Sequence, residues 1–494
     1  MRIKKDSIFF RAMALTGANL ALRMVTMGFQ VYLSGQIGAA GVGLLQLIQS
    51  VASLALTAGL GGIRTTTMYL TAQELGQQRP QATGTVLRVC FRYAMLFGTA
   101  AAAVVVLFSR QIAGQWIGDL QSLPALRTLG VLMPISCLCG VITGYYTAAS
   151  KIRQLVTVEF LEQAASMILT LGLLLFWSDG SPAQSCQAVI AGSSLAALVT
   201  LWSLLLTDRQ IRQQPKEKIP VARRMLAIAL PLALADDLRM GLSTIESLIT
   251  PKRLALYPMT QNALADFGTI SGMTFPVMMF PACILYALAE LLIPELSRCA
   301  AGGNQERING LCKKGLQGAL VYGLVCAGGL FLLSDRLGQG LYQSDAVGKY
   351  LKWFAPLVPM LYCDLITDAA VKGLGQQVKS VRNNIITSAM DVGMLWILLP
   401  KMGLAGYYLS FTVSHAVNFM LSISILRNLT DLTIPWRKVI PAAALCVGAV
   451  LAASFPASVT LQLTVFLALL AAGLWMLGLL KTANPPQNAT DCGG

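Results

Sequence analysis

The chain has 494 residues, of which 55% are hydrophobic and 12% are charged, and its formal net charge is +15. Soluble globular domains carry about 25% charged residues, so this composition excludes an ordinary soluble protein and places the chain among membrane proteins. The basic residues lie in short segments between apolar runs, not in a stripe interleaved with aromatic side chains, so the excess charge does not predict a nucleic-acid-binding protein.

Fourteen apolar runs follow one another along the chain, each near the length that crosses a bilayer. They cover residues 8–34, 43–63, 86–109, 123–149, 155–177, 185–206, 224–250, 264–293, 314–334, 350–371, 384–400, 403–426, 438–455 and 459–480. The sequence therefore predicts an all-α polytopic membrane protein of about 14 transmembrane helices. No small-residue cleavage site follows the first run, so we interpret it as a span and not as a signal peptide.

The basic residues also predict the orientation of the spans. Most of the 37 Lys and Arg residues fall in alternate loops, beginning with the N-terminal segment. Loops rich in Lys and Arg stay in the cytoplasm, so we expect both chain ends on the cytoplasmic side.

A weak internal repeat groups the predicted helices. Glu74-Leu75 and Glu295-Leu296 follow corresponding spans of the two halves at an offset of 221 residues. Because six spans are an even number, the two copies have the same orientation and are related by an axis along the membrane normal. The repeat predicts two pseudosymmetric six-helix lobes and a C-terminal helix pair, with an N-lobe over 1–206, a cytoplasmic linker over 207–223, a C-lobe over 224–427, two extra helices over 428–481 and a cytoplasmic tail over 482–494.

Charged side chains inside apolar spans cost at least about 2.5 kcal/mol and usually face a cavity or a partner. Arg23 in the first span and Arg239 in the seventh would be near symmetry mates, and two guanidinium groups at one cavity suit a pyrophosphate. The alternatives are an ion pair between Asp236 and Arg239 and an Arg23 that snorkels to the interface. The candidate substrate-binding residues are Arg23, Arg64, Arg239 and Glu246.

Two aspartates in the tenth span are candidates for ion coupling. Asp364 and Asp368 are four residues apart and so lie on one helix face. An acid in this position can take up a proton or bind Na⁺, and the alternative is local hydrogen bonding to neighbouring helices.

Glycine and proline mark predicted breaks in two spans. The candidate hinge or gating residues are Gly59, Gly61 and Gly62 in span two, and Pro276 and Pro281 in span eight. Such breaks permit rocking of helix bundles, and close helix packing explains them equally well.

The chain lacks the usual signatures of catalysis. It has no Walker loop, nucleophile elbow or HExxH motif, so we expect a transporter and not an enzyme, driven by a gradient or passive. His415 is the only histidine, and Cys137 and Cys139 lack zinc spacing, so no metal or other cofactor is predicted apart from Na⁺ or H⁺ as a coupling ion.

Four stretches carry a family resemblance. They are GAAGVGLLQ at 38–46, LSTIESLITPKRL at 242–254, the segment 272–297 with its prolines and LLIPELS ending, and 373–407, which contains GLGQQVKSVRN and LPKMGLAGY. They resemble the stage V sporulation protein B group of oligosaccharide flippases, within the superfamily that also holds the lipid II flippase and the multidrug exporters. The first stretch departs from the group in lacking its acidic residue.

The resemblance implies a two-lobe, 14-helix flippase of the bacterial cytoplasmic membrane that acts by alternating access. Its substrate would be an undecaprenyl-linked oligosaccharide for spore cortex or cell-wall synthesis, and it would work among membrane lipids as a monomer. Arginines on the first helices of each lobe matter in the lipid II flippase, and Arg23 and Arg239 occupy comparable helices. A cation-coupled multidrug exporter of the same fold is the alternative. A non-transporting scaffold is disfavoured because no sizeable extramembrane segment is present.

Overall fold

The computed structural model describes residues 3–77, 79, 82–149, 151–177, 181–207, 221–431, 436–455 and 458–479. These residues form helices and no strand. Among them, ten helices are long and apolar enough to cross a membrane, or eleven when one bent pair is counted as a span. The predicted class, an all-helical polytopic membrane protein, is therefore confirmed, and the count of 14 spans stays a prediction.

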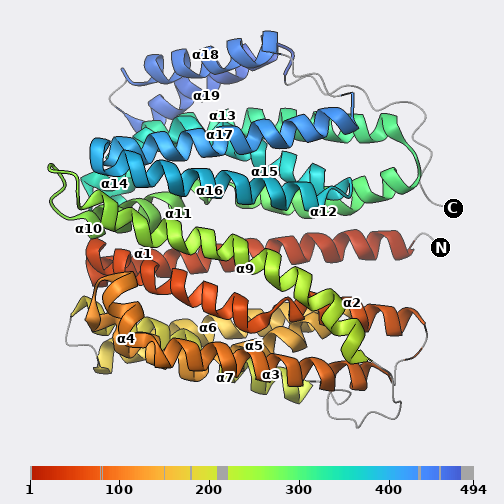
Figure 1. Cartoon of the computed structure of the whole chain (residues 1–494). Helices are drawn as coiled ribbons and strands as arrows, with labels where there is room; N and C mark the ends of the chain where they lie inside the picture. The colour runs from red at the N-terminus through yellow and green to blue at the C-terminus, as the bar shows by residue number, and fades with distance from the viewer. Residues whose placement is uncertain are drawn as a thin grey trace. The chain divides into compact units, whose positions relative to one another are not determined.

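The first helix, α1 (Ile3–Leu60), contains the first predicted run and most of the second, and it has 58 residues. A straight helix of this length would extend about 87 Å, nearly three times the ~30 Å hydrocarbon layer. The backbone leaves the helical conformation at Gly38, with φ 70° and ψ 173°, and Figure 1 shows α1 reverse its direction along its length. A second break separates α1 from α2 (Ile63–Gly76), where Gly61 and Gly62 have φ of 48° and 66°.

The chain divides into two compact units. The first comprises residues 1–255 and 261–268, and the second comprises 256–260 and 269–494. After α1 and α2, the first unit contains α3 (Thr83–Leu107), α4 (Ser109–Gln111), α5 (Leu123–Ala148), α6 (Ile152–Trp177), α7 (Pro182–Thr207), α9 (Val221–Leu254) and α10 (Ala263–Phe267). Its core joins α2, α3, α5 and α9 through fully buried side chains such as Tyr145 and Tyr146.

The position of α9 differs from the predicted lobe boundary. The repeat assigned residues 224–250 to the C-lobe, but α9 packs against α1 and α2 in the first unit. Its buried Met225 and Ala229 belong to the core of that unit, and the Thr244 hydroxyl donates a hydrogen bond to the Ser50 carbonyl at 3.0 Å. The two compact units are defined by contacts within the structure, whereas the two lobes were predicted from a sequence repeat. The boundary between the units therefore does not test the lobes, which stay a prediction. Most of the predicted linker and the whole predicted tail lie outside the described residues.

The second unit is built around α15 (Val358–Gly373), which packs mainly against α12 (Cys283–Ala301), α13 (Gln305–Tyr342) and α17 (Leu404–Leu429). α16 (Gln377–Met402) pairs with α17, and α14 (Asp345–Phe354) packs on α13. The blue helices α18 (Trp436–Ala453) and α19 (Val459–Met476) in Figure 1 contact one another and pack on α13 around the fully buried Phe466.

A sharp bend lies between α11 (Phe275–Met279) and α12. α11 follows the π-helical segment η4 (Gly268–Thr274) and completes the helix Ala263–Met279, which is bent by 64° relative to α12. Two tyrosines donate hydrogen bonds to backbone carbonyl groups at the break: Tyr322 donates to the Pro281 carbonyl at 2.9 Å, and Tyr362 donates to the Met278 carbonyl at 3.1 Å. Their rings stack with centroids 5.9 Å apart, so α13 and α15 together support the bend.

Candidate functional site

Three arginines of the first unit lie exposed within or beside apolar helices. Arg23 is on α1, Arg64 is in the first turn of α2, and Arg239 is on α9. Arginine facing hydrocarbon at the centre of a span costs about 2.5–3.5 kcal/mol or more, so an exposed arginine there indicates a polar, hydrated surface. Glu246 is half-buried seven residues after Arg239, which places the two on the same stripe of α9.

The structure does not support the alternative of an Asp236–Arg239 ion pair. Both side chains are exposed on α9, and among the described residues no ion pair joins them. The binding role of Arg23, Arg64, Arg239 and Glu246 stays a prediction.

The first unit also contains two carboxylates that the sequence analysis missed. Glu159 and Glu162 are half-buried on α6, inside the run 155–177 that was counted as apolar. The Glu162 carboxylate lies beside Thr200 of α7, and both carboxylates are near enough to Arg64 to interact with it electrostatically. Their presence in a predicted span was the available signal, because glutamate at membrane depth is costly unless it has a function or a partner.

Hydrogen bonds connect polar side chains of α15, α16 and α17 in the second unit. The Asn418 amide donates to the Asp364 carboxylate at 2.9 Å and accepts from the Thr387 hydroxyl at 3.5 Å. One turn beyond Thr387 on α16, Asp391 accepts a hydrogen bond from Ser410 at 2.6 Å. We refer to Asp364, Thr387, Asp391, Ser410 and Asn418 as the polar seam.

The two aspartates predicted to couple ions have different surroundings. Asp364 has one buried carboxylate oxygen with no hydrogen-bond partner. Asp368 instead accepts from Ser380 on α16 and forms an ion pair with Lys372 at 2.6 Å on its own helix. The local hydrogen bonding that was the alternative is therefore present at both residues. No group of three or more His, Cys, Asp or Glu residues in the described part of the chain is placed to hold a metal ion.

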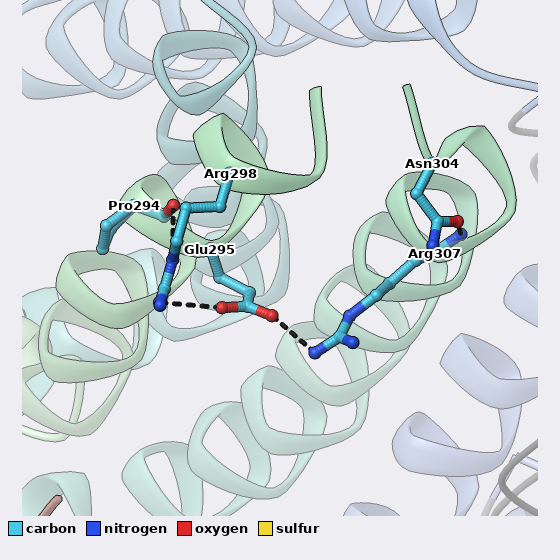
Figure 2. A network of polar contacts seen from close by, with 5 residues as sticks. All are labelled: Pro294, Glu295, Arg298, Asn304 and Arg307. Carbon is cyan, nitrogen blue, oxygen red and sulfur yellow. Dashed lines mark hydrogen bonds and ion pairs between the residues drawn. The ribbon is translucent and has the colours of Figure 1, made fainter. Parts of the chain in front are cut away.

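The two glutamates that mark the repeat both hold ion pairs at helix ends. Figure 2 shows Glu295, near the end of α12, between Arg298 at 2.8 Å and Arg307 of α13 at 2.6 Å. In the first unit, Glu74 near the end of α2 binds Arg224 of α9 at 3.0 Å. In each unit the glutamate therefore fixes the first turns of another helix.

The five predicted hinge residues have different surroundings, because some lie where a helix is broken and others lie within or against packed helices. Gly61 and Gly62 lie in the break between α1 and α2, and Pro281 lies in the break between α11 and α12. Pro276 is the second residue of α11. A Cβ at Gly59 would lie 3.0 Å from a sulfur atom on α5, so close packing explains this glycine. A hinge or gating role stays a prediction for all five.

Family models match nearly the whole chain. Residues 163–480 match the family described as lipid II flippase MurJ, and residues 15–170 match the family described as MatE. Stage V sporulation protein B of Bacillus subtilis strain 168 is 21% identical over 447 residues, which cover 88% of this chain and 86% of that protein. Sporulation protein YkvU of the same organism is 21% identical over 339 residues, or 66% of this chain and 74% of that protein.

Solved structures share the fold. Lipid II flippase MurJ in an inward closed conformation has a TM-score of 0.67 and 12% identity, covering 94% of this chain and 98% of that one. An inward-facing multidrug resistance MATE family transporter of the MOP superfamily also has a TM-score of 0.67, with 16% identity and coverage of 84% and 96%. The matched families are flippases and transporters, as predicted, and not enzymes. Because the MurJ model spans well over half of the residues, this chain belongs to the lipid II flippase MurJ family.

Proposed function

We propose that this protein is a flippase that moves an undecaprenyl-linked oligosaccharide across the bacterial cytoplasmic membrane by alternating access. The cargo is a peptidoglycan or polysaccharide precursor, used in spore cortex or cell-wall synthesis. The protein acts as a monomer of 14 spans with both ends in the cytoplasm. The observation that carries this proposal is the exposure of Arg23, Arg64 and Arg239 in a member of the MurJ family.

The arginines favour this cargo over a cationic drug. A pyrophosphate group accepts hydrogen bonds from forked guanidinium donors and neutralises their charge. A cationic compound would be repelled by the same side chains, although Glu159 and Glu162 offer acids that keep the multidrug exporter as the second candidate.

A coupling ion fits the polar seam. The unpartnered oxygen of Asp364 lies on the same carboxylate that Asn418 holds, so a proton or Na⁺ at this oxygen would satisfy it. We propose that an H⁺ or Na⁺ gradient drives transport through this site. Asp368 takes no part, since Lys372 and Ser380 already occupy its carboxylate.

Reconstituted flipping tests the function directly. Proteoliposomes carrying a fluorescent undecaprenyl-pyrophosphate sugar are assayed for the label that becomes accessible at the opposite leaflet. A charged hydrogen bond contributes about 1.5–3 kcal/mol, so an Arg23→Ala/Arg239→Ala variant should flip at least about tenfold more slowly. Arg88→Ala removes an exposed arginine from α3 and should flip at the wild-type rate.

Two outcomes would overturn the proposal. One is wild-type protein that exports a cationic dye down an ion gradient but moves no labelled sugar lipid. The other is an Arg23→Ala/Arg239→Ala variant with unchanged flipping.

A further inference from the structure

A groove with a volume of about 500 Å³ lies within the second unit, between α13, α15, α17 and α18. Its base is formed by buried Leu324, Cys363 and Cys446, and its rim includes the exposed Ala443 and Val447 of α18. Ligand pockets usually have volumes of about 300–1,000 Å³. The groove therefore has room for an apolar chain and is open along α18 to the surroundings of the protein.

Two lysines make one end of this groove positively charged. Lys313 of α13 and Lys438 of α18 both line it, both are exposed, and neither forms an ion pair among the described residues. Lys438 is the third residue of α18, where the partial positive charge of the helix end disfavours a lysine unless an anion is present. Two unneutralised cations beside an apolar groove are complementary to an anion that carries a hydrocarbon chain.

A hydrogen bond between two chain segments stabilises the positively charged end of the groove. Gln317, one turn after Lys313 on α13, lines the groove and donates a hydrogen bond to the Leu479 carbonyl at 2.5 Å. This contact ties the chain that follows α19 to α13 at the same end. Lys438 lies on α18, which itself packs on α13, the helix of Lys313.

We propose that this groove binds an anionic glycerophospholipid of the surrounding bilayer, with its phosphate between Lys313 and Lys438 and one acyl chain between α13 and α18. Basic pockets between membrane helices bind anionic headgroups in this manner. A sugar-bearing headgroup would need several neutral donors and acceptors, and Gln317 is the one amide side chain among the lining residues of this groove. The occupant is therefore a resident lipid that supports the packing of α18 and α19 on α13, and it is distinct from any transported sugar lipid.

Lipid binding to the purified full-length protein tests the assignment without any transport measurement. Delipidated protein is titrated with phosphatidylglycerol or with phosphatidylcholine of the same acyl chains, and bound lipid is counted by native mass spectrometry. Each lysine near an anionic headgroup contributes about 1 kcal/mol, so Lys313→Gln/Lys438→Gln should weaken phosphatidylglycerol binding on the order of 30-fold. Phosphatidylcholine should bind wild type at least about tenfold more weakly than phosphatidylglycerol.

Matched variants separate charge from folding. Lys314→Gln/Lys379→Gln removes two exposed lysines of the same unit that do not line the groove, and it should leave binding unchanged. Lys313→Arg/Lys438→Arg keeps both charges and should retain phosphatidylglycerol. Ala443→Trp fills the rim and should weaken both phospholipids.

Three results would overturn the proposal. The first is equal phosphatidylglycerol affinity in the Lys313→Gln/Lys438→Gln variant and its matched control. The second is equal affinity of wild type for the two phospholipids. The third is displacement of phosphatidylglycerol by undecaprenyl phosphate at much lower concentration, which would assign the groove to the polyprenyl carrier instead.

Discussion

Removing Arg224 should destabilise the first unit more than removing its partner Glu74. The two side chains form an ion pair at 3.0 Å, but only 1% of the Glu74 side chain is exposed, compared with 36% of Arg224. The other carboxylate oxygen of Glu74 is buried without a hydrogen-bond partner. An Arg224→Ala variant therefore leaves a buried charge unneutralised, whereas a Glu74→Ala variant leaves an arginine that reaches solvent and still donates to Gln73 at 2.7 Å.

The size of the effect follows from the charge that remains. Breaking a buried ion pair from one side costs about 3–5 kcal/mol. Because 36% of the Arg224 side chain is exposed, the pair is partly solvated, and its loss falls in the lower part of this range. We therefore expect Arg224→Ala to lower the free energy of unfolding by about 3–4 kcal/mol, and Glu74→Ala to lower it by about 1–2 kcal/mol, the loss of a partly solvated charged hydrogen bond.

Thermal unfolding of the detergent-solubilised protein measures the difference. At about 2–4 °C per kcal/mol, Arg224→Ala should melt several degrees below Glu74→Ala. Arg223→Ala, which removes an exposed neighbouring charge, is the matched control. Equal losses in the two variants would refute the reasoning.

Three further substitutions test other parts of the structure. Asp364→Asn should abolish the response of flipping to an imposed H⁺ or Na⁺ gradient while sugar-lipid binding is kept, and a retained gradient response would exclude the polar seam as the coupling site. Tyr322→Phe removes the hydrogen bond to the Pro281 carbonyl and should lower the melting temperature by about 2–4 °C, so an unchanged value would show that the bend does not need it. Gly268→Ala places a Cβ against the backbone oxygen of Ala39 in α1 and should cost about 1–3 kcal/mol or more, whereas Gly310→Ala, with open space around it, should cost nothing in the same melting experiment.

The spans were predictable where one apolar run makes one helix. The run 123–149 corresponds to α5 (Leu123–Ala148), and the run 185–206 corresponds to α7 (Pro182–Thr207), because the bilayer thickness sets both length and composition. The break of α1 at Gly38 falls in the gap between the runs 8–34 and 43–63, so hydropathy indicated where the chain turns but not which residue makes the turn. A single glycine changes the direction of the chain without interrupting the helical hydrogen bonding on either side.

The candidate site was harder to predict because its partners come from distant positions. Spacing placed Asp364 and Asp368 on one face of α15, but their contacts depend on Asn418 of α17 and Ser380 of α16. Which neighbouring helix each aspartate meets is a tertiary property that a four-residue spacing does not contain. Glu159 and Glu162 of α6 were not predicted for a different reason, because the helix that contains them keeps a high mean hydropathy of 1.6 over its apolar window despite the two carboxylates.

Gly38 is selected for handedness and not for size. Its φ of 70° and ψ of 173° belong to a backbone region that is essentially restricted to glycine, yet a Cβ built there meets no atom within 4 Å. Any other L-amino acid at this position would therefore shift the backbone and change the angle between the two helical segments of α1, even though its side chain has room. A D-alanine introduced by chemical ligation has the mirror-image preference and would fit the observed backbone, so the geometry of this joint depends on chirality at one α-carbon.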